Sequence, residues 1–266
     1  MTEAKPLAAR QDRARPVTRE QIAATALRLL VEHGPDAVSL RGVARDLGMT
    51  APGLYRYYGS REELLRHVIA QLLQGLADDI RLAISEADAH YSSGQPAGAG
   101  PASGAMPELA QRARVTEKLT TGCQEFRQWA RRHKDEFMLL FGAPLPQAGD
   151  AGSDVVKDSV LEFARTFYSM FVELWDVLPI PVPDQAELRP GYGAQFAWFR
   201  DQLPRGAPDG MIVVFLRCWA LLYGAVSIEI CGHVAIAFDD PDQMFELILA
   251  DLARMVGLEY PIPASR

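Results

Sequence analysis

Apolar residues recur at spacings of three and four along most of the chain, which is the pattern of amphipathic α-helices. The first such stretch, with Ile22, Ala26 and Leu30 on one face, follows Thr18-Arg-Glu-Gln21, which has the form of a helix capping box. No stretch shows the sustained alternation of apolar and polar residues that is typical of half-buried β-strands. The hydrophobic pattern therefore predicts an all-α fold.

Three further helices are predicted close behind the first. Ser39 can cap a short helix that ends at Gly48. Pro52 is acceptable only in the first turn of a helix, because it has no N–H to donate, so the next helix must begin near Ala51. A second capping box, Ser60-Arg-Glu-Glu63, opens a long helix whose apolar stripe comprises Leu65, Ile69, Leu72, Leu76, Ile80 and Ile84.

The remaining helices are predicted over residues 108–133, 134–141, 155–175, 211–231 and 241–256. Between the two groups of helices, residues 92–107 consist of Gly, Ala, Ser and Pro at 14 of 16 positions, which predicts a disordered loop. We therefore expect a small three-helix domain at residues 17–65 and a larger helical domain at 66–266. Residues 1–16 are expected to form a flexible basic arm.

Composition narrows the possible classes of protein. Hydrophobic residues make up 48% and charged residues 23% of the chain, as in ordinary globular proteins. The apolar stretch at 211–231 is long enough to span a bilayer but contains Arg217 and Glu229, so we expect a buried helix and no membrane segment. The N-terminus lacks the apolar part of a secretory signal, and the three cysteines form no metal-binding pattern. A reduced, cytoplasmic protein without a metal is predicted.

Charge is distributed unevenly along the chain. Residues 1–75 hold 11 Lys and Arg against 8 Asp and Glu, whereas the rest of the chain holds 16 against 26. Within the first part, residues 37–61 carry four arginines and a single acid, Asp46. A polyanion such as DNA would be repelled by the acidic part and tolerated by the basic part, although a charged run is usually just a solvated face.

The two short helices and the tight turn between them fit a helix-turn-helix, whose second helix enters the major groove of DNA. Leu54 and Tyr58 lie four residues apart and can both face inward, which leaves large side chains between them on the outer face. Of these, Arg56 can reach base edges or phosphates. Tyr55 and Tyr57 can donate their hydroxyls to phosphate oxygens.

The start of the second helix also faces DNA in this arrangement. Arg41 can approach from the preceding helix, and a low-relief surface is offered to the bases by Thr50, Ala51, Pro52 and Gly53. A glycine inside a helix costs about 1 kcal/mol relative to alanine. Gly53 is explained if DNA passes too close for a Cβ atom, although it is alternatively a tolerated imperfection.

Residues 17–65 resemble the DNA-binding domain of the TetR family of transcriptional regulators in one contiguous match. Its most distinctive part is Leu54-Tyr-Arg-Tyr-Tyr-Gly-Ser-Arg-Glu-Glu-Leu64, in which Tyr58 and Arg61 replace the family's more common Phe and Lys. The resemblance implies that phosphates are held by Tyr55, Tyr57 and Arg61. It also implies base-facing positions for Arg41, Ala51, Pro52, Gly53 and Arg56.

The rest of the chain resembles a C-terminal subgroup of that family with a Trp-His-Gly element, at residues 124–130 and 218–233. Tyr223 stands where this subgroup has His. The family resemblance implies a cavity for a small effector, and the few charges on the ring-bearing helices favour a largely apolar one. Rings at helical spacing are also the normal filling of a helical core. The candidate cavity residues are Phe126, Trp129, Phe137, Phe141, Phe167, Phe171, Trp175, Trp219 and Tyr223.

Helix-turn-helix proteins usually bind two half-sites about 34–36 Å apart, which predicts a homodimer on an inverted repeat in double-stranded DNA. The stretch at 211–231 is apolar nearly all round, and the stretch at 241–256 has an apolar stripe. The family resemblance suggests that both contribute to an intersubunit four-helix bundle, although both could be internal core helices. An effector that binds better to a form with misplaced reading helices would then relieve repression.

Other function classes fit the sequence less well. There is no GxSxG, HExxH, GxGxxG or GxxxxGK[ST] motif, so no catalytic residue and no cofactor are expected, and an enzyme is a remote alternative. A non-specific architectural DNA binder would use the same arginines and tyrosines. A protein-interaction module would instead turn Tyr55, Arg56 and Tyr57 toward a partner helix.

Overall fold

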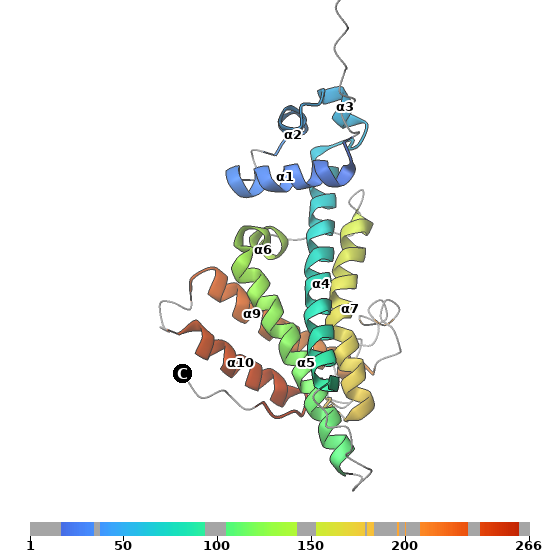
Figure 1. Ribbon diagram of the computed structural model, residues 1–266, viewed down its shortest axis with the longest axis vertical. Helices are drawn as coiled ribbons and strands as arrows, with labels where there is room; N and C mark the ends of the chain where they lie inside the picture. The colour runs from blue at the N-terminus through green and yellow to red at the C-terminus, as the bar shows by residue number, and fades with distance from the viewer. Residues whose placement is uncertain are drawn as a thin grey trace, which may run out of the picture. The chain divides into compact units, whose positions relative to one another are not determined.

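The predicted all-α fold is confirmed, because every regular element among the described residues of the computed structural model is a helix (Figure 1). The structure describes residues 17–34, 38–93, 105–142, 153–178, 180–183, 196, 200, 208–233 and 240–260. The helices are α1 (Arg19–His33), α2 (Leu40–Asp46), α3 (Ala51–Tyr55), α4 (Arg61–Ser93), α5 (Ala105–Arg132), α6 (Lys134–Phe141), α7 (Ser153–Val177), α9 (Asp209–Ile230) and α10 (Pro241–Met255). The chain divides into two compact units, Met1–Val68 and Ile69–Arg266, and α4 contributes to both.

Side-chain caps set the helix ends of the first unit where the sequence predicts them. The hydroxyl of Thr18 accepts a hydrogen bond from the backbone N–H of Gln21 at 3.3 Å, and the Gln21 side chain accepts from the Thr18 N–H at 3.0 Å. Ser39 caps α2 by accepting from the N–H of Gly42 at 3.0 Å. Gly48 follows α2 with a φ of 64°, a conformation that costs glycine little because it has no Cβ.

The start of α4 differs from the predicted capping box in one bond. Ser60 accepts from the backbone N–H of Glu63 at 3.1 Å, as expected. The Glu63 carboxylate, however, accepts from the N–H of Gly59 at 2.7 Å, one residue before the position that a capping box requires. The carboxylate therefore stabilises the turn that leads into α4.

The apolar stripe of α4 also begins one residue earlier than predicted. Leu64 and Val68 are buried, whereas the predicted Leu65 and Ile69 are only half-buried. Leu76, which the prediction does include, is fully buried in the second unit. The buried face of α4 therefore changes along the helix: Leu64 and Val68 belong to the first unit, whereas Leu76 belongs to the second.

Aromatic rings fill the core of the second unit. Phe126 of α5 is fully buried, and its ring centroid lies 5.4–6.3 Å from those of Phe137, Phe141, Phe163, Phe167 and Trp219. These distances are typical of tilted and edge-to-face ring pairs, which are stabilised beyond the burial of their area. The rings come from α5, α6, α7 and α9, so this cluster joins four helices of the unit.

A buried ion-pair network joins α5 to α9 and α10. The Arg127 guanidinium, only 5% exposed, donates to both carboxylate oxygens of Glu229 at 2.7 and 2.9 Å. It also lies 2.7 Å from the carboxylate of Asp242 and stacks 4.5 Å from the centre of the Phe245 ring. Arg131 donates to the same Asp242 carboxylate at 2.8 Å. The buried Arg127 charge is therefore matched by Glu229, and the exposed pair Asp242 and Arg131 extends the network to the surface.

Among the described helices, α9 alone is long and apolar enough to cross a bilayer, with a mean hydropathy of 2.0. Its apolar side chains include Met211, Ile212, Phe215 and Leu222, which are buried in the core of the second unit. Core packing therefore accounts for much of its composition.

The predicted loop at 92–107 is shorter than expected, because α4 continues to Ser93 and α5 begins at Ala105. Residues 94–104 lie outside the described residues, and so does the predicted flexible arm at 1–16. The disorder predicted for both stretches stays a prediction.

We expect Glu229→Gln to lower the free energy of unfolding of the second unit by about 3 kcal/mol, because it leaves the buried Arg127 charge poorly matched. Asp251→Asn is the matched control, since it removes an exposed ion pair to Arg254 on α10 and should cost less than about 1 kcal/mol. Urea unfolding followed by tryptophan fluorescence measures both, because all four tryptophans lie in the second unit. Equal effects of the two substitutions would contradict the importance of the buried network.

Candidate functional site

The second helix of the predicted helix-turn-helix, α3, has only five residues and is held at both ends. At its start, the Thr50 hydroxyl accepts from the backbone N–H of Gly53 at 3.2 Å, and Pro52 occupies the first turn. Its inner face is anchored by Leu54, and Tyr58 just beyond its end is likewise almost completely buried. The orientation of α3 within the first unit is therefore fixed by packing.

Tyr58 ties α3 to the helices on either side of it. Its hydroxyl donates to the carbonyl oxygen of Arg19 at 3.2 Å and lies 2.9 Å from Nδ1 of His67. The Arg19 guanidinium lies 5.2 Å from the centre of the Tyr58 ring. Burial raises the pKa of Tyr58 to about 12 and lowers the pKa of His67. Both side chains are therefore neutral near pH 7, as suits a buried contact.

The outer surface of α2 and α3 is polar and basic. Thr50, Pro52, Tyr55, Arg56 and Arg41 are exposed, as the predicted DNA contacts require, and Ala51 is half-buried. Tyr55 keeps 49% of its surface, which is unusual for an aromatic side chain.

Arg45 is a basic residue that the predicted contact set omits. It is exposed and lies four residues after Arg41 on α2, so both project from the same side of that helix. The spacing of four residues between Arg41 and Arg45 could have indicated from the sequence that both arginines lie on one face of the helix.

Tyr57 and Arg61 are placed differently from the other predicted phosphate contacts. The Tyr57 hydroxyl donates to the carbonyl oxygen of Val17 at 2.9 Å, and Nε of Arg61 donates to the carbonyl oxygen of Val38 at 2.7 Å. Both side chains are half-buried. The Tyr57 hydroxyl, which was expected to donate to a DNA phosphate, therefore donates to a carbonyl oxygen within the first unit.

Gly53 is buried, and the first unit itself supplies a reason for it. A Cβ atom there would lie 3.1 Å from Oγ1 of Thr50, the hydroxyl that caps α3. Glycine therefore avoids a tight contact with the capping hydroxyl, and the predicted close approach of DNA at Gly53 stays a prediction.

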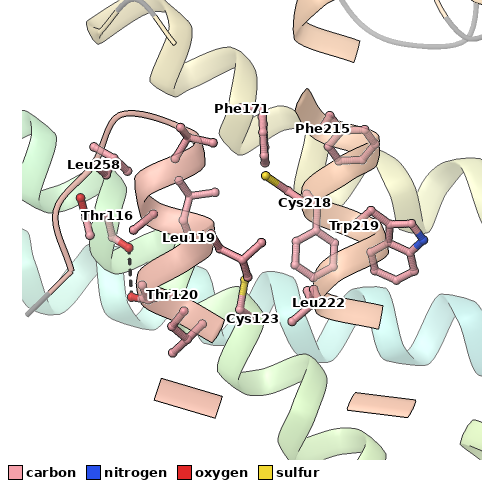
Figure 2. Close-up of a pocket in the computed structure, with 15 residues that line it drawn as sticks. Thr116, Leu119, Thr120, Cys123, Phe171, Phe215, Cys218, Trp219, Leu222 and Leu258 are labelled. Carbon is pink, nitrogen blue, oxygen red and sulfur yellow. Dashed lines mark hydrogen bonds between the residues drawn. The ribbon is translucent and has the colours of Figure 1, made fainter. Parts of the chain in front are cut away.

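A small cavity of about 50 Å³ lies in the second unit between α5, α7, α9, α10 and the residues after α10 (Figure 2). Figure 2 shows Leu119, Phe171 and Cys218 turned toward one another across it. Its wall is formed by Thr116, Leu119, Thr120, Cys123, Phe167, Phe171, Phe215, Cys218, Trp219, Leu222, Leu249, Leu252, Ala253, Val256 and Leu258.

The cavity wall offers neither charge nor an unused hydroxyl donor. The Thr116 hydroxyl donates to the carbonyl oxygen of Arg112 at 2.9 Å, and that of Thr120 to the carbonyl oxygen of Thr116 at 3.0 Å. Burial raises the pKa values of Cys123 and Cys218 to about 12, so both thiols stay protonated. The cavity is therefore apolar and chemically unreactive.

Three of the nine predicted cavity residues line this space: Phe167, Phe171 and Trp219. The other six do not line it, and a ligand contact stays a prediction for Phe126, Trp129, Phe137, Phe141, Trp175 and Tyr223. They pack into the surrounding core; Trp129, for example, lies 5.0 Å from the His133 ring. The wall residues that the prediction omits are mostly aliphatic, and their spacing does not distinguish them from other core residues.

Tyr223, which stands at the predicted subgroup histidine, has a structural role. Its hydroxyl donates to the carbonyl oxygen of Phe141 at 2.8 Å, and its ring stacks on Trp219 with centroids 6.1 Å apart. It therefore joins the end of α6 to α9 behind the cavity wall.

The outer face of α9 and α10, which pack side by side, is partly apolar (Figure 1). Leu216, Ile228 and Leu247 keep 38%, 42% and 42% of their surface exposed. Between the helices runs a groove of about 270 Å³. Its lining comprises Ala220, Leu221, Gly224, Ala225, Ile228, Glu229, Pro241, Met244, Phe245 and Ile248.

Comparison with known proteins identifies both parts of the chain. A family model described as "Tetracyclin repressor-like, C-terminal domain" matches residues 119–252, and one described as "Bacterial regulatory proteins, tetR family" matches residues 22–68. The likeness to a Trp-His-Gly subgroup stays a prediction.

Relatives and solved structures agree with the family models. An HTH-type transcriptional regulator of Mycobacterium tuberculosis, Rv1816, is 26% identical over 244 residues, which cover 88% of this chain and 94% of the relative. The BetI regulator of Rhizobium meliloti is 36% identical over 72 residues, or 27% of this chain and 36% of BetI.

Two solved structures share the fold. Regulatory protein SCO4313 matches with a TM-score of 0.59 and 24% identity, over 88% of this chain and 94% of its own. The fatty acid degradation regulator FadR from Bacillus halodurans matches with a TM-score of 0.50 and 14% identity, over 88% and 97% of the two chains. With both parts of the chain matched by family models, this protein belongs to the TetR family of helix-turn-helix, DNA-binding transcriptional regulators.

Proposed function

We propose that this regulator is a cytoplasmic, dimeric repressor that binds an inverted-repeat operator and is released from it by a small, uncharged, apolar effector. The observation that carries the proposal is the exposed basic face of α2 and α3, whose inner side is anchored by Leu54 and Tyr58. A helix fixed in this way can present the same side chains to each operator it meets.

DNA contact is assigned to the side chains on that face. Arg56 and Arg41 carry the charge and planar donors that suit base edges and phosphates, and Arg45 adds a third cation. Tyr55 can donate its hydroxyl to a phosphate oxygen. Tyr57 and Arg61 have a supporting role, because their hydrogen bonds to the carbonyl oxygens of Val17 and Val38 hold the backbone around the reading helix.

Dimerisation is assigned to the outer face of α9 and α10. Three large apolar side chains stay exposed there, and monomeric surfaces rarely gather such groups without a partner. Gly224 lies within α9, and no atom outside the helix backbone lies within 4 Å of where its Cβ would be. Its backbone is therefore open to close approach by a helix of the second subunit.

Effector action is assigned to the apolar cavity and to α4. A ligand in the cavity can contact only α5, α7, α9, α10 and the residues after α10. The second half of α4 is tied to two of these helices, through Asp88 to Arg114 of α5 at 2.5 Å and through Arg81 to Glu162 of α7 at 3.2 Å. Because α4 begins in the first unit, a ligand that favours another packing of these helices can shift the population of DNA-binding dimers.

Selection of bound fragments from a random duplex pool tests the proposed specificity. We expect an inverted repeat to be enriched, and Arg56→Ala to relax the preference at defined positions because a base contact is lost. Arg132→Ala, which removes an exposed arginine from α5, should leave the selected sequence unchanged. Binding that shows no sequence preference and only fades with salt would instead indicate an architectural DNA binder.

Removal of the hydroxyl group from Tyr55 and from Tyr57 is expected to have different effects. Tyr55→Phe should weaken binding to every duplex alike and leave amide hydrogen exchange in the first unit unchanged, because the Tyr55 side chain is exposed. Tyr57→Phe should speed that exchange, because it removes a half-buried hydrogen bond worth about 1 kcal/mol. Fluorescence anisotropy and exchange mass spectrometry provide the two readouts, and the reverse pattern would overturn the assignment.

Introducing a carboxylate on the outer face of α9 tests the proposed dimer interface. We expect Leu216→Glu to yield monomers in sedimentation experiments at micromolar protein, because an unpaired carboxylate is costly to bury between subunits. Leu82→Glu is the control, since Leu82 is 60% exposed on α4 and outside the proposed interface. A dimer that persists in Leu216→Glu and dissociates in Leu82→Glu would place the interface elsewhere.

A further inference from the structure

One part of the cavity wall is built differently from the rest. Most of the wall belongs to α5, α7, α9 and α10, which have 28, 25, 22 and 15 residues. The remaining part is the C-terminal strap, which we define as Val256–Tyr260, the five residues that follow Met255 at the end of α10. Val256 and Leu258 of this strap line the cavity and are only 3% and 7% exposed.

The backbone of the C-terminal strap is hydrogen-bonded to the last turn of α10, with Val256 donating to the carbonyl oxygen of Ala253 at 3.1 Å and Gly257 to that of Arg254 at 3.2 Å. Leu258 donates its backbone N–H to the carbonyl oxygen of Ala253 at 2.9 Å, which closes the turn at the end of α10. Gly257 has a φ of 77°, and a Cβ atom on it would lie 3.1 Å from Cδ of Pro181. The strap therefore packs tightly against Pro181, but it belongs to no helix.

Side-chain hydrogen bonds of Tyr260 fix the end of the strap. The Tyr260 hydroxyl donates to the carboxylate of Glu246 on α10 at 2.6 Å. Burial and the neighbouring Glu246 carboxylate raise the pKa of Tyr260, so its hydroxyl keeps its proton and remains a donor. The Tyr260 side chain is also hydrogen-bonded to the side chain of Gln124 on α5.

The size of the cavity requires that some wall residue moves. A dry cavity of about 150 Å³ admits benzene, whereas this cavity measures about 50 Å³. The helical walls are shared with the ring cluster and with the Arg127 network, so their displacement would disturb the core. The strap belongs to no helix, so its displacement would break the hydrogen bonds of Tyr260 and the packing of Val256 and Leu258 but would leave the four helices in place.

The wall also restricts the chemistry of the ligand. Its two threonine hydroxyls donate to backbone carbonyls, its two thiols are protonated, and no charged side chain lines it. A carboxylate would be buried there without a partner, which is unfavourable by several kcal/mol. An uncharged apolar molecule has no such desolvation cost when it enters the cavity.

We propose that the C-terminal strap is the movable wall of the cavity, that the Tyr260–Glu246 hydrogen bond is its latch, and that Leu258 sets the size of the neutral apolar ligand admitted. This inference deepens the proposed effector function and rests on it for its consequence at the operator. The binding step itself is independent of DNA.

The latch is tested with the full-length protein and 1-aminoanthracene, an uncharged fluorescent aromatic probe, in the absence of DNA. We expect Tyr260→Phe to raise the association rate about fivefold, because opening no longer breaks the bond to Glu246. Tyr55→Phe is the matched control, since it is the same change at an exposed site in the first unit and should leave the rate unchanged. An unchanged rate in Tyr260→Phe would overturn the latch.

Ligand size and charge are tested by competition against the same probe. We expect 1-octanol to displace 1-aminoanthracene and octanoate, of equal chain length, to do so at least tenfold more weakly, since every 1.4 kcal/mol corresponds to about tenfold. Leu258→Ala should strengthen binding of the probe, whereas Leu82→Ala, at an exposed leucine, should not. Equal competition by octanoate, or weaker probe binding in Leu258→Ala with the fold intact by circular dichroism, would overturn the proposal.

Failure of this inference and failure of the proposed function give different results. Neutral ligands that bind through the strap but leave operator affinity unchanged would contradict the effector function alone. Release from the operator by compounds whose binding is insensitive to Tyr260→Phe and Leu258→Ala would contradict the strap alone.

Discussion

Burial of Leu54 and Tyr58 is the constraint on which the DNA-binding unit depends. A five-residue helix makes too few internal hydrogen bonds to persist alone, so α3 exists because its inner face is anchored and its start is capped by Thr50. Once that face is fixed, helical geometry leaves Tyr55 and Arg56 outside. The surface offered to DNA thus follows from the packing beneath it, and Gly53 avoids a tight contact with the Thr50 hydroxyl that caps the helix.

Two kinds of packing coexist in the second unit. Around Phe126 the rings are close-packed, and the Arg127 network neutralises the charges that α5, α9 and α10 bring into the interior. Phe167 and Trp219 belong both to this ring cluster and to the wall of the cavity, whose other residues are mostly aliphatic. A short strap after α10, which belongs to no helix, completes the wall.

The sequence predicted what depends on local chemistry. The Thr18 capping box, the Ser39 cap and the position of Pro52 gave the helix starts of the first unit, because each rests on bonds within one turn. It could not show that Tyr57 bonds to Val17, forty residues away, because such a pair is set by tertiary packing.

The same limit applies to the cavity. Aromatic residues at helical spacing were expected to line it, but six of the nine fill the core, since periodicity shows which face of a helix is buried and not which buried residue borders a space. Leu258 carries no pattern at all, because its place in the wall depends on the turn at Gly257.

In the proposed mechanism, occupancy of the cavity changes how the first unit binds DNA. Titration of the selected operator with protein, at fixed salt and with or without saturating 1-octanol, measures this coupling. Operator binding should weaken with 1-octanol and stay unchanged with octanoate, whereas equal affinity under saturating 1-octanol would contradict the coupling.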